Sequence, residues 1–202
     1  MAMKIVLIHG YKSSSQGNFF PWLRDSLHAK GHEVICPDLP SADEPNPEEW
    51  TKTLIEEVGV IDDETIIVGH SIGAVTALRF LEAAEARSTP KGVVLVSPPW
   101  MIKSETFQGF FLSELDFDVL MWKASRFVVI HSHDDKKIPF DHAKKYADVL
   151  HARLIERNEG EGHFLGERYP VILETIEKLI EEEIVYDPGG VLEHQYEKDR
   201  II

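Results

Sequence analysis

The chain has 202 residues, of which 43% are hydrophobic and 28% charged, and this is enough for one well-filled core of ordinary globular composition. Its 35 acidic and 21 basic side chains give a formal charge of −14, which would repel phosphate backbones and anionic lipid, so we expect neither nucleic acid nor a membrane as a partner. The single cysteine, Cys36, excludes an internal disulfide and a cysteine zinc cluster, and it fits a reducing, cytoplasmic compartment. The apolar run at 5–8 is too short for a secretion signal, and no run reaches the length of a transmembrane helix.

Strand-like runs of Val, Ile and Leu alternate with segments of helical periodicity along the chain. We expect six strands, at 5–8, 34–35, 65–68, 93–96, 127–130 and 154–155. We expect helices after Asn18, after the N-cap Asn46, from 71 to about 86, from Pro139 and from Pro170. Because the strands are continuously apolar rather than alternating, they predict a mostly parallel sheet with helices on both faces, which is an α/β fold of three layers.

Two segments break this alternation. Residues 98–123 form an insertion that is rich in aromatic side chains, with Trp100, Phe107, Phe110, Phe111, Phe117 and Trp122. The insertion could cover the edge of the sheet where a helix is missing, or form a small lid and an apolar acyl pocket over the site. We favour the pocket, because the insertion follows a strand at its carboxyl end, and the candidate pocket residues are then Trp100, Phe107, Phe110 and Phe111. Residues 186–202 have no clear periodicity and are interpreted as a tail, so we expect one domain over residues 1–185.

The stretch Gly69-His70-Ser71-Ile72-Gly73 matches the pattern Gly-x-Ser-x-Gly at the place where a predicted strand turns into a predicted helix. Glycines are needed on both sides because so sharp a turn brings the flanking positions close to the neighbouring strand and helix. The turn would expose the hydroxyl of Ser71 as a nucleophile, and the amide of Ile72, at the helix N-terminus, would face a developing oxyanion. A second oxyanion donor is expected from the loop after the first strand, where the amide of Tyr11 is the candidate.

A serine hydroxyl needs a base, and the base needs an orienting acid. His163 is the candidate base, since it stands on a glycine-rich loop before the last predicted helix. The candidate acids are Asp134 and Asp135, on the loop after the strand at 127–130. Asp135 follows Ser71 by 64 residues and precedes His163 by 28, so each spacing leaves room for whole strand-helix units. All three residues would then emerge at the carboxyl ends of strands, where open α/β sheets place their sites.

The sequence gives less reason to assign a chemical role to histidines other than His163. His9 and His70, beside the predicted oxyanion loop and the nucleophile, are interpreted as pocket-lining or hydrogen-bonded structural groups. His131 and His133, with the two aspartates that follow, resemble a metal-ligand cluster. No further histidine follows at the spacing that such metallohydrolase sites use, so we expect no metal. Cys36 is interpreted as a small buried hydrophobic residue.

Together these motifs resemble the α/β-hydrolase superfamily, and within it the small serine hydrolases related to retinoblastoma-binding protein 9 and the bacterial YdeN-type proteins. The resemblance runs from about Lys4 to Glu183, and it rests on His9-Gly10-Tyr11, Gly69-His70-Ser71-Ile72-Gly73, Ser97-Pro98-Pro99, Asp134-Asp135-Lys136-Lys137-Ile138-Pro139 and Gly162-His163-Phe164. It implies a minimal α/β-hydrolase fold that needs no cofactor. It also selects Asp135 as the acid, since the superfamily commonly places this residue four positions before a proline. The Leu-x-Cys-x-Glu signature of retinoblastoma binding is not met around Cys36, so that partner is not implied.

The sequence therefore predicts a serine hydrolase that cleaves a small carboxylic ester or a related acyl bond through Ser71, His163 and Asp135. One alternative is a thioesterase or an amidase, which the same three residues would serve. Another is a protein-binding module that keeps the fold and works by docking a partner. A large exposed apolar patch on the insertion would favour the binding module.

Overall fold

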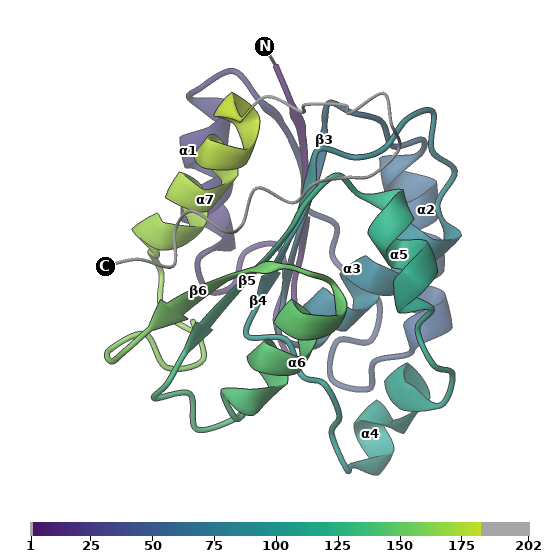
Figure 1. Cartoon of the computed structure of the whole chain (residues 1–202), viewed down its shortest axis with the longest axis vertical. Coiled ribbons are helices and arrows are strands. Elements are labelled where there is room, and N and C mark those ends of the chain that lie inside the picture. The colour runs from purple at the N-terminus through teal and green to yellow at the C-terminus, as the bar shows by residue number, and fades with distance from the viewer. Residues whose placement is uncertain (1, 183–202) are drawn as a thin grey trace.

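The computed structural model describes residues 2–182, and the predicted tail at 186–202 lies outside them (Figure 1). The strands are β1 (Lys4–Ile8), β2 (Glu33–Ile35), β3 (Thr65–His70), β4 (Gly92–Val96), β5 (Phe127–Ser132) and β6 (Arg153–Arg157). The helices are α1 (Phe20–His28), α2 (Pro47–Val58), α3 (Ile72–Ala83), α4 (Glu105–Gln108), α5 (Phe117–Lys123), α6 (Asp141–Val149) and α7 (Pro170–Glu181), with a 3₁₀ turn at Gly109–Phe111. Every predicted strand and helix is present, so the predicted alternation of strands and helices is confirmed.

The six strands form one sheet in the order β2-β1-β3-β4-β5-β6, and all of the pairings between these strands are parallel. The chain adds β2 on one side of β1 and then β3 on the other, so the loops after β1 and β3 diverge at this point. Open α/β sheets bind ligands in the crevice that opens beyond the carboxyl ends of strands at such a switch point. The loop that begins at His9 and the turn at Ser71 both lie there.

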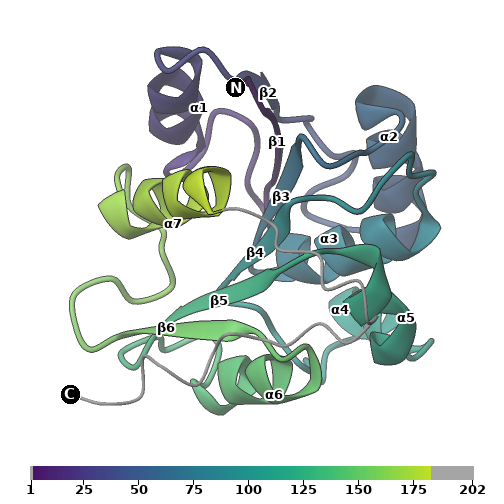
Figure 2. The same cartoon turned by 45° about the horizontal axis from the view of Figure 1, so that its top comes forward.

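Helices cover both faces of the sheet, as predicted (Figure 2). Side chains alternate along each strand between two buried clusters. In β1, Ile5 and Leu7 pack in the cluster that includes α1 and α7, whereas Val6 and Ile8 pack in the cluster that includes α2, α3, α5 and α6. The residues of both clusters are buried, which explains why the runs 66–68 and 93–96 of the central strands are apolar at every position. The result is a three-layer α/β architecture with a parallel sheet between two layers of helices.

The start of α2 follows from local chemistry. The side-chain oxygen of Asn46 accepts a hydrogen bond from the amide of Glu49 at 3.0 Å, and Pro47 occupies the first helical position, where no amide hydrogen is needed. The helix then buries Trp50, whose indole N–H donates to the carbonyl of Pro40 at 2.7 Å. This bond ties α2 to the loop that follows β2.

Two helix boundaries differ from the prediction. The helix expected to reach residue 86 ends at Ala83, because the chain turns there to form a bridge between Ala86 and Ile61. The helix expected from Pro139 begins at Asp141, and the carbonyl of Pro139 instead accepts the amide of His142 in the turn before it. Neither change moves a predicted site residue, since both lie outside the loops that carry them.

Candidate active site

Ser71 stands in strained backbone geometry between β3 and α3. Its φ is 55° and its ψ is −128°, a region that residues with a side chain rarely adopt. A Cβ atom on Gly69 would lie 2.5 Å from the carbonyl oxygen of Gly73, and one on Gly73 would lie 2.5 Å from the carbonyl oxygen of Ile8. Backbone occupies the space on both sides of the turn, which explains why glycine flanks the serine.

We expect Gly73→Ala to lower the free energy of unfolding by about 3 kcal/mol, because the added methyl group can be accommodated only if β1 moves away from α3. Denaturant unfolding measures this change. Gly109→Ala is the matched control: its Cβ would meet only the ring of Pro47, at 3.3 Å, so its unfolding free energy should change by less than about 1 kcal/mol. Equal effects of the two substitutions would contradict the steric account of the turn.

The three side chains predicted to act together meet in one chain of hydrogen bonds. Nε2 of His163 lies 2.9 Å from Oγ of Ser71, and Nδ1 of His163 lies 2.7 Å from Oδ2 of Asp135. Ser71 follows β3, His163 follows β6 and Asp135 follows β5. The three residues therefore meet at the carboxyl ends of these parallel strands. A base in contact with a hydroxyl on one side and a carboxylate on the other is the arrangement that nucleophilic catalysis by serine requires.

The carboxylate of Asp135 is buried and held from several sides. Its Oδ1 accepts the amides of Lys137 at 2.8 Å and Ile138 at 3.0 Å, while its Oδ2 accepts the N–H of His163. Burial by itself would raise the pKa of Asp135, but the hydrogen bonds from His163 and from the two amides lower this pKa to about 2. Asp135 is therefore ionised at neutral pH and oriented by its own turn.

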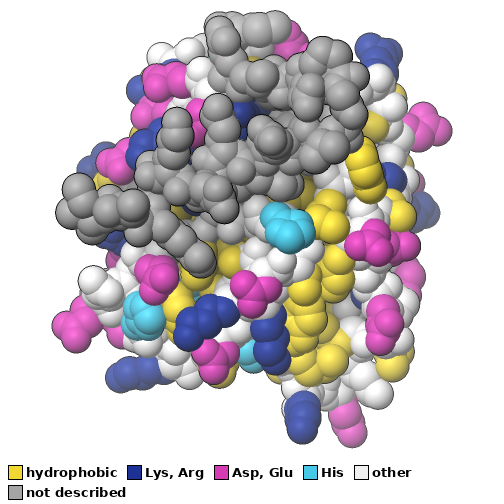
Figure 3. Space-filling view, viewed as in Figure 1, with side chains coloured by type: hydrophobic (Ala, Val, Ile, Leu, Met, Phe, Trp, Pro, Cys, Tyr) yellow, Lys and Arg dark blue, Asp and Glu magenta, His cyan; other side chains and the backbone are white. Residues whose placement is uncertain are grey.

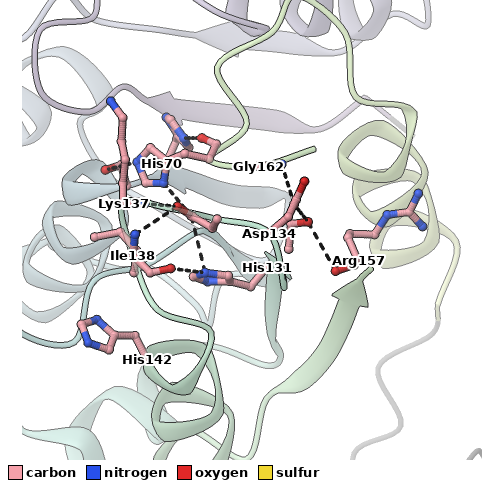
Figure 4. A network of polar contacts seen from close by, with 12 residues as sticks. His70, His131, Asp134, Lys137, Ile138, His142, Arg157 and Gly162 are labelled. Atoms are coloured by element: carbon pink, nitrogen blue, oxygen red, sulfur yellow. Dashed lines mark hydrogen bonds and ion pairs between the residues drawn. The ribbon is translucent and has the colours of Figure 1, made fainter. Parts of the chain in front are cut away.

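Asp134, the other candidate acid, orders the loop between β6 and α7 that carries His163, which we call the histidine loop. Its carboxylate accepts hydrogen bonds from the amides of Gly160 at 2.8 Å and Gly162 at 2.9 Å, and Figure 4 shows it facing Gly162. It also accepts the hydroxyl of Ser132. The bond from Ser132 and those from the two glycine amides lower the pKa of Asp134. Its side chain does not contact His163, so its role in the structure is to order the loop that carries that residue.

His70 holds the same loop from the other side. Its Nε2–H donates to the backbone carbonyl of His163 at 2.8 Å, and its ring is almost fully buried. Burial, followed by the nearby charge of His163, lowers the pKa of His70 to about 3. His70 is therefore neutral, with its proton on Nε2, and acts as a donor that holds the backbone of His163. The sequence did not predict this contact.

We expect His70→Leu to lower kcat for an ester by about 10- to 100-fold, because the backbone of His163 loses a donor that positions the ring. His70→Gln should retain most of the activity, since its side-chain amide reaches the same carbonyl. Steady-state kinetics on the two variants measures the difference. Equal losses in both would show that burial of an imidazole ring, rather than the hydrogen bond, is what matters here.

The low pKa of His70 predicts how the free energy of unfolding depends on pH. The pKa of His70 is about 3 in the folded chain against an ordinary value of 6.5, so the unfolded chain binds more protons between these values. The free energy of unfolding should therefore fall as the pH drops from 6.5 towards 3. Chemical denaturation at several pH values tests this, and His70→Leu should show a flatter dependence in that range. A wild type whose stability is constant from pH 7 to pH 4 would contradict it.

The two residues predicted to donate to an oxyanion, Tyr11 and Ile72, both belong to segments next to Ser71. Gly10 approaches it so closely that a Cβ on Gly10 would lie 3.0 Å from the Cβ of Ser71, which places Tyr11 at the nucleophile. Ile72 is the first residue of α3, so its amide has no acceptor within the helix. Both Tyr11 and Ile72 line the cavity beside Ser71. The two candidate residues are therefore brought to the same cavity as Ser71.

A cavity of about 240 Å³ opens over Ser71 and His163. The residues that line it are Gly10, Tyr11, Ser13, Asn18, His70, Ser71, Ile72, Ile102, Phe107, Lys137, Ile138, His163 and Leu165. Its walls differ in character: Ile102, Phe107 and Leu165 are apolar, whereas Ser13 and Asn18 are polar. The cavity therefore offers one surface for a hydrocarbon group and another for hydrogen bonding.

The predicted pocket residues are only partly brought to this cavity. Phe107 and His70 line it, and the ring of Phe107 meets that of Tyr11 edge to face with centroids 5.0 Å apart. His9 does not line it: its Nδ1–H donates to the carbonyl of Gly10 and its Nε2 accepts the amide of Leu39, so it is a buried structural group. Burial lowers the pKa of His9, which keeps its ring neutral.

The other three aromatic candidates are also placed elsewhere, which corrects the pocket interpretation for them. Phe110 is buried against Trp50, with ring centroids 5.6 Å apart, and Phe111 packs against the same core cluster. Trp100 stacks on Phe117 with centroids 5.3 Å apart, and its amide donates to Nδ1 of His142. The insertion therefore mainly covers the α3 side of the sheet, and only Ile102 and Phe107 from it reach the cavity.

Sequence reasoning also missed several residues that line the cavity. Ser13 and Asn18 lie on the loop after β1, Lys137 and Ile138 follow Asp135, and Leu165 closely follows His163. These residues are close in the chain to predicted site residues, and this closeness could have marked them as candidates. Closeness in the chain alone does not indicate which side chains point into the cavity.

The histidine pair considered for metal binding is split between two environments. His131 is buried and its Nε2–H donates to the carbonyl of Ile138 at 3.0 Å, whereas His133 lies at the surface, 2.9 Å from a carboxylate oxygen of Glu156. Within residues 2–182, no group of three or more His, Cys, Asp or Glu side chains is arranged to hold a metal ion. None of the helices in that range is both long and apolar enough to cross a bilayer.

Comparison with known proteins agrees with the motifs. The sequence profile of the serine hydrolase family matches residues 5–179. YdeN of Bacillus subtilis (strain 168) is 32% identical over 193 residues, which cover 91% of this chain and 99% of YdeN. The serine hydrolase RBBP9 of Rattus norvegicus is 22% identical over 166 residues, covering 80% of this chain and 86% of RBBP9. The crystal structure of the B. subtilis ydeN gene product matches with a TM-score of 0.81 at 29% identity, covering 90% of this chain and 100% of that one.

Proposed function

Because this chain belongs to the serine hydrolase family, we propose that it cleaves carboxylic esters through Ser71, His163 and Asp135. Oγ of Ser71 attacks the ester carbonyl while Nε2 of His163 takes its proton, and the carboxylate of Asp135 stabilises the imidazolium that forms. The proton then passes to the departing alcohol, which leaves an acyl group on Ser71. Water, activated by the same imidazole, releases the acid. The observation that carries this proposal is the unbroken pair of hydrogen bonds from Ser71 through His163 to Asp135.

The amides of Tyr11 and Ile72 complete the proposed mechanism. The carbonyl oxygen gains negative charge when Ser71 attacks, and two backbone N–H groups beside the nucleophile stabilise that charge without any reorganisation. The dipole of α3 adds to this at Ile72, its first residue. No metal ion or organic cofactor has a step in this reaction.

The size of the cavity supports a small substrate. Its volume of about 240 Å³ lies below the roughly 300–1,000 Å³ of sites that hold drug-sized ligands. Phe107 and Ile102 are among the apolar side chains that line it. We therefore propose that the acyl group is short, and that Phe107 limits its length.

A series of p-nitrophenyl esters from acetate to palmitate tests both proposals. We expect kcat/KM to be highest among esters with short acyl chains and to fall for octanoate and longer ones. Phe107→Ala should move the optimum towards longer chains, while Phe111→Ala, which changes a residue outside the cavity, should leave the optimum in place. If the folded protein turns over no ester but does turn over a thioester or an amide of the same acid, then a thioesterase or amidase replaces the esterase proposal.

A protein-binding role is a second candidate, supported by apolar side chains that the insertion leaves exposed. Leu112 is 73% exposed and Trp122 is 72% exposed, and Figure 3 shows a band of hydrophobic side chains on the face that carries α5 and α6. A photo-crosslinking residue placed at position 122 should then give a discrete protein adduct in cells, whereas one placed at exposed Lys52 should not. Absence of an adduct at position 122 would remove this candidate.

A further inference from the structure

The cavity beside Ser71 has an unusual charge for this chain. Among the described residues, 13 line it, and these include Lys137 but no aspartate or glutamate. Lys137 is also the one lysine or arginine among the described residues that lines it. The chain as a whole carries a formal charge of −14, so a cavity with a lysine and no carboxylate in its lining contrasts with the rest of the molecule.

The ammonium group of Lys137 has no carboxylate partner within residues 2–182. None of the ion pairs found there includes it. Its backbone is nevertheless held in place, because its amide donates to Asp135 at 2.8 Å and the next amide, that of Ile138, donates to the same oxygen. Figure 4 shows Lys137 beside His70, and both residues line the cavity together with Ser71 and His163. Lys137 is therefore a cavity-lining cation without a carboxylate partner in the part of the chain that the structure describes.

Further groups around the cavity suit an anion. The side-chain amide of Asn18 donates to Oγ of Ser13 at 3.1 Å, which leaves the Ser13 hydroxyl hydrogen free for another acceptor. Both side chains line the cavity. The Nζ of Lys12 lies 5.2 Å from the ring centroid of Tyr11, another lining residue, and adds a second positive charge nearby. Ile102, Phe107 and Leu165 are among the apolar side chains of the lining.

We infer that the site selects esters that carry a carboxylate, which pairs with Lys137. This inference rests on the proposed ester hydrolysis and adds a substrate class to it. The ammonium group attracts an anionic substrate and repels a cationic one, so it contributes selectivity as well as affinity. The carboxylate belongs either to the acyl group or to the alcohol.

Two matched pairs of substrates test the inference and distinguish these two positions. In the acyl pair, mono-p-nitrophenyl glutarate is compared with p-nitrophenyl pentanoate. In the leaving-group pair, 4-acetoxybenzoate is compared with its methyl ester. The readout in each pair is the kcat/KM of the charged ester divided by that of the neutral one, in wild type, Lys137→Met, Lys137→Glu and Lys136→Met. Lys136 is the matched control, because it is an exposed neighbouring lysine that does not line the cavity.

We expect Lys137→Met to lower this ratio at least about fivefold in one of the two pairs, and Lys137→Glu to lower it at least about tenfold. Lys136→Met should leave the ratio within about twofold, and 0.5 M NaCl should lower the wild-type ratio towards that of Lys137→Met. If Lys137→Glu leaves the ratio unchanged in both pairs while the neutral esters are hydrolysed, the inference is wrong and the proposed function stands. If the folded wild type hydrolyses none of the four esters, the proposed function fails and the inference fails with it.

Discussion

Replacing Ser71 with alanine is expected to lower kcat for ester hydrolysis by about 10⁴-fold or more, because no other group remains to form the acyl-enzyme. The fold should survive, since alanine removes a single oxygen from a site that is already open to the cavity. Steady-state turnover of p-nitrophenyl acetate measures the loss, and circular dichroism measures the fold.

Ser97 provides a matched control for this experiment. Like Ser71 it directly follows a strand and has a positive φ, 46° against 55°, but it is buried and its hydroxyl has no partner among the described residues. Ser97→Ala should therefore retain turnover. A folded Ser71→Ala variant with turnover close to that of wild type would contradict the assignment of the nucleophile.

Asp135→Asn is expected to lower kcat by about 10⁴-fold, because an amide in this place presents the wrong hydrogen-bonding group to Nδ1 of His163 and no longer stabilises the imidazolium. Asp134→Asn is the matched comparison. It disturbs the bonds from Ser132, Gly160 and Gly162 but none to His163, so we expect kcat to fall by at most about 100-fold.

The ratio between these two losses decides which aspartate acts as the acid. It is measured by steady-state kinetics on variants whose thermal unfolding shows that they are folded. A larger loss in Asp134→Asn than in Asp135→Asn would overturn the choice of Asp135.

Most of the fold could be predicted from the sequence because the signals are local. A run such as Ile66–Val68 is apolar at every position because both of its faces are buried, and this marks a strand between two layers of helices. Asn46 and Pro47 mark the start of α2 through groups that lie within one turn of the helix. The parallel arrangement follows because helices separate successive strands.

The insertion could not be predicted in the same way, because its fold depends on distant partners. Phe110 is buried because it meets Trp50, which lies 60 residues earlier in the chain. Trp100 is held by His142 and Tyr146, whose hydroxyl donates to the carbonyl of Pro99 at 3.0 Å. The sequence does not distinguish an aromatic side chain that fills a core from one that lines a pocket. Of the four aromatic residues predicted to line the pocket, Phe107 alone lies at the cavity.

The residues of the candidate site also fall into two groups: those with a local sequence signal and those whose role depends on distant contacts. Ser71 and His163 stand out because glycines and strand ends surround them, and Asp135 needed the family resemblance to be separated from Asp134. The sequence allowed a structural role for His70 and a loop-capping role for Asp134, but it did not predict their partners, which are backbone groups of the loop that carries His163. Nearly every residue has the same backbone carbonyl and amide, so a sequence pattern does not indicate which of these groups a side chain will contact.

The most direct test of the account is to identify the residue that becomes acylated or phosphonylated. The folded wild type is treated with a fluorophosphonate probe, digested, and analysed by mass spectrometry, with His163→Ala treated in parallel. The account predicts one probe per chain, attached to Ser71, and much slower labelling of His163→Ala. A probe attached to another residue, or a folded protein that does not react at all, would contradict it.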